Sequence, residues 1–324
     1  MKRKTFCLLA AAALLAGGMN AHAQGAYPAQ PVKWIVPYAP GGTTDVIARN
    51  LAARMGPDMG QSVIVDNKPG AASIIGATFI ARSQPDGYTV GTADSGTLAF
   101  NPAMYATLTY DAGKDFTFIG GLGKMPLVLA VAPGFPARNV RELLALAKRS
   151  PGSISSASSG PGSPLHVALE LFKQRTGTDL MHVPYKGSAP ALQDLMAGQV
   201  QTMFVDLPPS LSMIKSGKVR VLAVATPQRL SILPDVPTMA EAGVPGFEAY
   251  AWQGFVGPAR LPDAVVRKLN ASLVAALRHP ETRARLEELG IQPMPMAPAE
   301  FTDFVHSEQK LWSGVIKAAN IRLD

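Results

Sequence analysis

The sequence predicts an α/β protein with parallel sheets, because short β-rich runs alternate with amphipathic helices along most of its length. Of the 324 residues, 47% are hydrophobic and 16% are charged, and no tract is of low complexity, as in a globular protein. No repeat of about 20 to 50 residues is visible, which excludes solenoids and propellers. Alternating strands and helices place helices on both faces of a parallel sheet. At about 150 residues per domain, the chain is long enough for two domains.

The first segment has the features of an export signal. Lys2, Arg3 and Lys4 precede an uncharged apolar stretch, residues 6–16, and residues 21–23 read Ala-His-Ala, the pattern that signal peptidase cleaves. The apolar stretch is shorter than the about 20 residues that a transmembrane helix needs. We therefore predict a signal peptide at residues 1–23, cleavage after Ala23, and a periplasmic location.

The sequence lacks the residues that several classes of function require. Cys7, the one cysteine, lies in the predicted signal peptide, so the mature chain has no disulfide, cysteine nucleophile or cysteine ligand. The five histidines have neither H-x-x-x-H nor H-E-x-x-H spacing, and we expect no metal. The net charge of +7 falls to +4 on cleavage and is dispersed, which argues against nucleic acid as a partner. Residues 121–123 begin a dinucleotide-like pattern, but Pro126 replaces its third glycine, and we expect no cofactor.

The individual elements follow from hydrophobic periodicity. We expect strands at residues 32–36, 62–65, 88–92, 154–157, 201–205 and 219–225, and a short strand ending at 182–183. A helix begins near Thr43 and Thr44, because Ile47, Leu51, Met55 and Met59 then share one face. Further helices are expected at residues 71–82, 141–149, 165–175, 189–196, around 266–277, and at 298–320.

Two apolar, glycine-containing stretches interrupt this alternation, residues 116–132 and 250–257. They are either ordinary core strands or two crossings between domains. In the second case, the middle of the chain forms the second domain.

Two turns combine a strand end, glycine and a helix start, and we call them the first cradle (residues 38–45) and the second cradle (residues 185–190). The first N–H groups of a helix lack partners, and the helix dipole makes this end positive. Glycine allows close approach, so each turn is suited to a carboxylate or phosphate. The candidate ligand residues are Tyr38, Pro40, Gly41, Gly42, Thr43 and Asp45 in the first cradle, and Tyr185, Lys186, Gly187, Ser188 and Ala189 in the second.

Other candidates follow neighbouring strands. They are Ser95 after the strand at 88–92, Ser158 and Ser159 in a serine-rich turn, His166 in the next helix, and Asp206. The serine-rich turn either supplies donors or only caps a helix. Asp206 either pairs with a ligand ammonium, fixes loop amides or caps the helix after it. No G-x-S-x-G motif is present, and a hydrolase built on Ser158 or Ser159 needs a base that the sequence does not identify.

Seven blocks resemble the Bug family, the extracytoplasmic solute receptors of tripartite tricarboxylate transporters. The first runs from Tyr27 to Asp45 and contains Val-Pro-Tyr-Ala-Pro-Gly-Gly-Thr-Thr-Asp. The others are residues 65–71, 85–89, 183–187, 198–200, 217–224 and 233–238, in matching order and spacing. One departure is Ser73, where family members often have asparagine.

The resemblance implies a type II periplasmic-binding-protein fold, in which two α/β domains are joined by two crossing strands and enclose a ligand cleft. The implied division is residues 24–122 with 253–324 as domain 1, and residues 123–252 as domain 2. It also implies that backbone amides at residues 40–43 and 186–189 hold the ligand's carboxylates.

The function we expect is that of a monomeric receptor. It captures a small carboxylated metabolite, closes by hinge motion and delivers the ligand to membrane permease subunits, without catalysing a reaction. The alternatives are a ligand sensor that feeds a two-component signalling system and a secreted hydrolase on the same fold.

Overall fold

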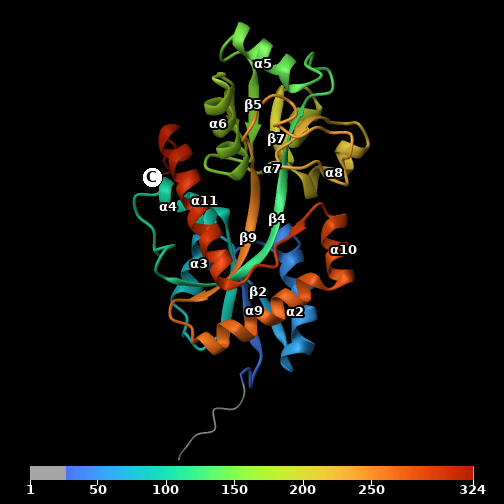
Figure 1. The fold of residues 1–324 in the computed structure, drawn as a ribbon. Coiled ribbons are helices and arrows are strands. Elements are labelled where there is room, and N and C mark those ends of the chain that lie inside the picture. Colours follow the sequence, from blue (N-terminus) through green and yellow to red (C-terminus); the bar gives the residue numbers. More distant parts are fainter. Residues whose placement is uncertain (1–26, 324) are drawn as a thin grey trace, which may run out of the picture.

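The computed structural model describes residues 27–323, and the predicted signal peptide, with Cys7 and the cleavage site, lies outside them. Two lobes stand one above the other in Figure 1. The chain first builds the lower lobe, which we call the first lobe. Its elements here are β1 (Val32–Val36), α2 (Thr43–Met59), β2 (Val63–Asn67), α3 (Ile74–Ala81), β3 (Thr89–Asp94), a π-helical segment (Gly96–Phe100) and α4 (Asn101–Met104).

The long strand β4 (Phe116–Val131) leads into the second lobe, and β9 (Tyr250–Pro258) leads back. Between them lie α5 (Val140–Arg149), β5 (Ser155–Ser158), α6 (Pro164–Thr176), β6 (Met181–Pro184), α7 (Ser188–Met196), β7 (Thr202–Asp206), α8 (Leu207–Lys215) and β8 (Arg220–Val224). After β9 come α9 (Asp263–Arg278), α10 (Pro280–Glu288), β10 (Gln292–Pro293) and α11 (Pro298–Ala318).

Strand β4 takes part in the sheets of both lobes. The first sheet has the order β2-β1-β3-β9-β4-β10, and β1 is parallel to β2 and β3. The second has the order β6-β5-β7-β4-β8, and β5 is parallel to β6 and β7. Residues 116–126 of β4 pair with β9, residues 127–131 pair with β7, and residues 128–131 also pair with β8. The two stretches that interrupt the sequence pattern are thus the crossing strands of a type II periplasmic-binding fold.

Glycines in β4 allow its neighbours to approach closely. A Cβ atom at Gly121 would lie 2.8 Å from both Cβ and the carbonyl oxygen of Met294, beside β10. A Cβ atom at Gly123 would lie 2.9 Å from Cγ2 of Ile291, just before β10. The glycines that begin a dinucleotide-like pattern in the sequence therefore serve packing.

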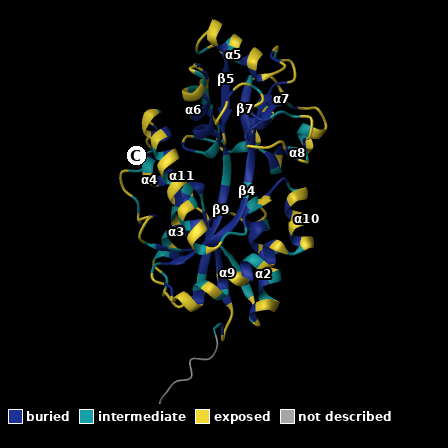
Figure 2. Cartoon of the chain, in the orientation of Figure 1, coloured by how far each residue is buried: buried dark blue, intermediate teal, exposed yellow. Residues whose placement is uncertain are grey.

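The helices cover the sheets through two buried clusters. In one, α2 and α9 pack on the first sheet, and Trp34 contacts Phe255 with ring centroids 4.3 Å apart. In the other, α11 lies along the crossing strands, and buried Glu308 accepts hydrogen bonds from the indoles of Trp252 (2.7 Å) and Trp312 (3.0 Å). Figure 2 shows the strands largely buried and the outer faces of the helices exposed.

Most predicted elements are present, with one corrected helix start. Ile47, Leu51, Met55 and Met59 of α2 are all buried, as their spacing predicts. The helix predicted at 71–82 begins only at Ile74, because residues 71–73 have φ angles of 45°, 48° and 73°, which are left-handed rather than helical. Within residues 27–323, no helix has the length and apolar character needed to cross a membrane.

Candidate functional site

The first cradle joins β1 to α2 and presents backbone amides. Gly41 has a φ of 83°, which favours glycine, and its N–H donates to Oδ2 of Asp45 at 2.9 Å. The N–H groups of Gly42, Thr43 and Thr44 donate to no protein group among residues 27–323. Gly41 and Gly42 are exposed, as is Pro40 before them. Three donors at the positive end of α2 are therefore available to an anion.

Asp45 fixes the first cradle through buried hydrogen bonds. It is only 3% exposed and accepts hydrogen bonds from Nε of Arg49 (2.9 Å), Nδ2 of Asn67 (2.9 Å) and the Gly41 amide. Burial alone would raise the pKa of Asp45, but these hydrogen bonds outweigh it and lower the pKa below its ordinary value. The hydrogen bonds assign Asp45 to shaping the turn.

The floor beside the first cradle is polar. Gln253 on β9 donates from Nε2 to Oγ1 of Thr44 at 2.7 Å, which ties the cradle to a crossing strand. Asp94, at the end of β3, accepts hydrogen bonds from the Tyr38 hydroxyl and from the N–H and hydroxyl of Thr97. Burial, with Asp94 nearby, raises the pKa of Tyr38 far above its ordinary value. Ser95 is 1% exposed, so its side chain lies beneath this surface.

The second cradle joins β6 to α7 in the other lobe. Gly187 has a φ of 113°, and its N–H donates to the Ser159 carbonyl at 3.1 Å. Across the described chain, the N–H groups of Lys186, Ser188 and Ala189 have no protein acceptor. The Tyr185 hydroxyl donates to Asp194 at 2.6 Å, and this hydrogen bond raises the pKa of Tyr185 to about 12. The second cradle thus also combines an internally fixed glycine with free amides.

The serine-rich turn contains a serine–histidine contact. Oγ of Ser158 lies 2.7 Å from Nε2 of His182, whose ring stacks on that of His166 with centroids 3.7 Å apart. The Gly162 N–H donates to Nδ1 of His166 at 3.0 Å. Burial lowers the pKa of both histidines to about 4, so both are neutral near pH 7.

The base that a hydrolase needs is therefore next to Ser158, although the sequence did not identify it. Ser158 is nevertheless fully buried at 0% exposure, so a substrate cannot reach its Oγ in this arrangement. A histidine with a pKa near 4 is also a weak base at neutral pH. Within residues 27–323, no group of three or more His, Cys, Asp or Glu side chains is placed to hold a metal ion.

Asp206 ends β7 opposite Leu127 of β4 and occupies the N-cap position of α8. Its side chain makes no capping hydrogen bond, so the structure does not support the capping interpretation. Burial raises the pKa of Asp206 to about 6, while a hydrogen bond with the Ser188 side chain opposes this shift. Asp206 therefore lies beside the second cradle.

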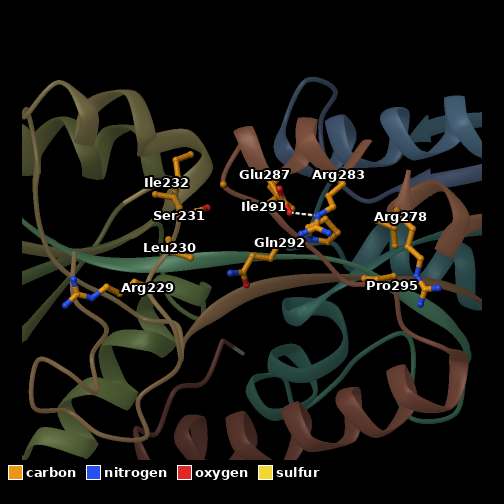
Figure 3. Close-up of a pocket in the computed structure, with 14 residues that line it drawn as sticks. Arg229, Leu230, Ser231, Ile232, Arg278, Arg283, Glu287, Ile291, Gln292 and Pro295 are labelled. Atoms are coloured by element: carbon orange, nitrogen blue, oxygen red, sulfur yellow. Dashed lines mark hydrogen bonds and ion pairs between the residues drawn. The ribbon is translucent and has the colours of Figure 1, made fainter. Parts of the chain in front are cut away.

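A cavity of about 480 Å³ also spans the lobes, on the β10 side of β4. Figure 3 shows Leu230, Ser231 and Ile232 on one side and Arg283, Glu287 and Ile291 on the other. Arg283 donates from Nε to Glu287 at 2.7 Å. None of the site residues predicted from the sequence lines it. Its residues come from separate segments without a motif, so the sequence carried no signal for it.

Sequence reasoning also missed Gln253, Asn67 and His182. Asn67 and Gln253 lie on strands and contact the first cradle only through the fold, so no local pattern identifies them. Asp94 carried a signal, because an aspartate followed by Ser-Gly-Thr at a strand end is typical of a side-chain-capped turn.

Comparison with known proteins gives consistent matches. Residues 47–321 match the family model described as tripartite tricarboxylate transporter family receptor. Protein BugT of Bordetella pertussis is 35% identical over 298 residues, which is 92% of this chain and 91% of BugT.

Two solved structures from Rhodopseudomonas palustris are similar over nearly their whole length. Rpa4515 with adipate is 37% identical with a TM-score of 0.81, covering 91% of this chain and 99% of that one. MatC with bound malate is 34% identical with a TM-score of 0.76, covering 90% of this chain and 100% of that one. With the shared fold, these matches show that the chain belongs to the tripartite tricarboxylate transporter receptor family of periplasmic solute-binding proteins.

Proposed function

We propose that this protein captures a small dicarboxylate between its lobes and delivers it to the membrane permease of a tripartite transporter. The observation that carries the proposal is the pair of cradles, one in each lobe, with amide donors that no group among residues 27–323 uses. Each is the N-terminal end of a helix, where partial positive charge favours an anion. Adipate and malate, named for two similar structures, each carry two carboxylates, one for each cradle.

We expect the two lobes to close over the ligand, because of this arrangement. A ligand that touches both cradles stabilises the closed state over the open one, because only closure lets both sets of amides bind it. We take residues 24–122 with 253–324 as one rigid body and residues 123–252 as the other. The change of β4 partners between residues 126 and 127 supports a boundary near the middle of the crossing strands.

The ligand contacts we propose fall into two groups. The first group faces the ligand. It consists of the amides of Gly42, Thr43, Ser188 and Ala189, the surface of Pro40, and the exposed Lys186. The second group does not touch the ligand but fixes the two turns. Its members are Tyr38, Asp45, Ser95, Ser158, His166, Tyr185 and the amides of Gly41 and Gly187. Ser159 fixes the second cradle through its carbonyl. We propose no catalytic role, which the burial of Ser158 supports.

Gly42→Val tests the first cradle. Gly42 has a φ of −75°, and a Cβ atom there meets only the Ala39 carbonyl oxygen, at 3.7 Å. The backbone therefore tolerates the change, while the side chain fills the space in front of the free amides. We expect adipate or malate to bind about tenfold or more weakly by isothermal titration calorimetry, a loss of at least about 1.4 kcal/mol.

The matched control is Gly134→Val, in an exposed turn of the second lobe where an added Cβ also has open space. It should leave affinity unchanged. Equal affinities of the wild type and a folded Gly42→Val variant would refute the first cradle as a binding element. Delivery is tested separately, because cells that lack this protein should lose uptake of the labelled ligand while keeping the permease.

A further inference from the structure

Helix capping does not explain the position of the Asp206 carboxyl group. In the part of the chain that the structure describes, this carboxyl group forms no capping hydrogen bond and no ion pair, although it sits where a cap would be. Its neighbour is the Ser188 hydroxyl, and Ser188 also supplies one of the free amides of the second cradle. A carboxylate bound at that amide therefore lies close to a second carboxyl group, that of Asp206.

Lys186 faces the ligand in the proposed function, but no charged side chain among residues 27–323 contributes to the pKa of Asp206 itself. The titratable and charged groups on elements around β7 are Lys124 on β4, His166, Glu170, Lys173 and Arg175 on α6, His182 on β6, Tyr185, Lys186 and Asp194 around α7, and Lys215 on α8. None of them contributes to the perturbation of Asp206, which comes from burial and Ser188 alone. Two neighbouring carboxylates in a partly desolvated site do not both stay ionised.

We propose that Asp206 is a proton-linked specificity residue: a dicarboxylate is bound together with one solvent proton, which Asp206 holds and donates as a hydrogen bond to the ligand. A ligand with an ammonium group instead binds to the ionised Asp206 carboxylate and needs no added proton. This inference rests on the proposed function, since it assumes that a carboxylate occupies the second cradle.

The protonation of Asp206 sets the direction in which dicarboxylate affinity changes with pH. In the free protein the pKa of Asp206 is about 6, so the group is mostly ionised at pH 7.5. A ligand carboxylate raises that pKa further, and dicarboxylate affinity then falls by up to about tenfold per pH unit above pH 6. Below about pH 6 Asp206 already holds its proton, and the dependence on this group disappears. His166 and His182, with pKa values of about 4, stay neutral in this range.

Calorimetric titration of adipate at pH 7.5, in two buffers with different ionisation enthalpies, measures the protons taken up on binding. We expect about one proton per adipate for the wild type and for Asp179→Asn, an exposed aspartate of the same lobe. We expect about zero for Asp206→Asn, whose amide donates without a proton, and about zero for wild type with aspartate as ligand. Thermal unfolding checks that the variants fold.

Adipate binding without proton uptake by the wild type overturns the inference, and so does equal uptake by Asp206→Asn. In either case the receptor function still stands, because binding itself has been observed. If neither adipate, malate nor aspartate binds the folded wild type, the proposed function fails, and this inference fails with it.

Discussion

At the scale of single residues, the first cradle depends on an internal anion. Asp45 occupies part of the positive end of α2 and accepts a hydrogen bond from the Gly41 amide, so the protein's own groups fix the shape of the turn. Only the amides beyond it remain for a ligand. A buried carboxylate with three hydrogen-bond donors stabilises the fold as well as the site.

Asp45→Asn should lower the free energy of unfolding by about 1 to 2 kcal/mol at pH 7, because charge-assisted hydrogen bonds become neutral ones. The folded-state pKa lies below the ordinary value of 3.8, so this stabilisation is full above about pH 4 and is lost as the pH falls through the folded pKa. Urea unfolding at several pH values measures the difference.

Asp58→Asn is the control for Asp45. Asp58 makes an exposed ion pair of 3.7 Å with Lys268, and such pairs contribute little. A difference between Asp45→Asn and the wild type that persists unchanged at pH 2 would show that charge is not the cause.

Local sequence signals predicted both cradles, but not which of their amides are free. Gly41 and Gly187 were among the predicted donors, yet both N–H groups are used inside the protein, by Asp45 and by the Ser159 carbonyl. Their partners lie four and twenty-eight residues away, and only the first is within reach of a local pattern. For the same reason, the sequence did not predict that Gln253 contacts Thr44 or that His182 contacts Ser158.

At the scale of elements, β4 decides how the lobes are joined. Its length and apolar glycine-rich sequence left two interpretations open, a core strand or a crossing. The structure combines them, because the strand is buried and yet changes partners from β9 to β7 and β8. By contrast, the start of α3 was mispredicted, since the apolar periodicity of residues 71–82 says nothing of the left-handed backbone at 71–73.

Gly121→Ala should lower the free energy of unfolding by about 1 to 3 kcal/mol, as overpacking does in cores. Its Cβ would lie 2.8 Å from the Met294 carbonyl oxygen, and a backbone atom cannot rotate away. Gly134→Ala, with no atom within 4 Å of its Cβ, should change stability by less than about 0.5 kcal/mol. Chemical denaturation compares the two, and equal stabilities would contradict close packing at β4.

At the scale of the whole molecule, the lobes touch on both sides of the crossing strands. On one side, Gly162 of the second lobe lies against Met104 and Leu323, where an added Cβ would meet Sδ of Met104 at 2.5 Å. On the other, Leu207 at the start of α8 lies against Gly290, which follows α10. The cavity beside Leu207 is bounded by both lobes, so the hinge motion proposed above would change its shape.

Small-angle X-ray scattering with and without saturating adipate or malate tests capture by closure most directly. We expect the ligand to reduce the radius of gyration of the wild type, because it bridges the first and second cradles and draws the lobes together. Gly42→Val, at the same ligand concentration, should remain closer to the ligand-free curve. Identical curves for the wild type with and without a ligand that calorimetry shows to be bound would contradict the two-cradle account.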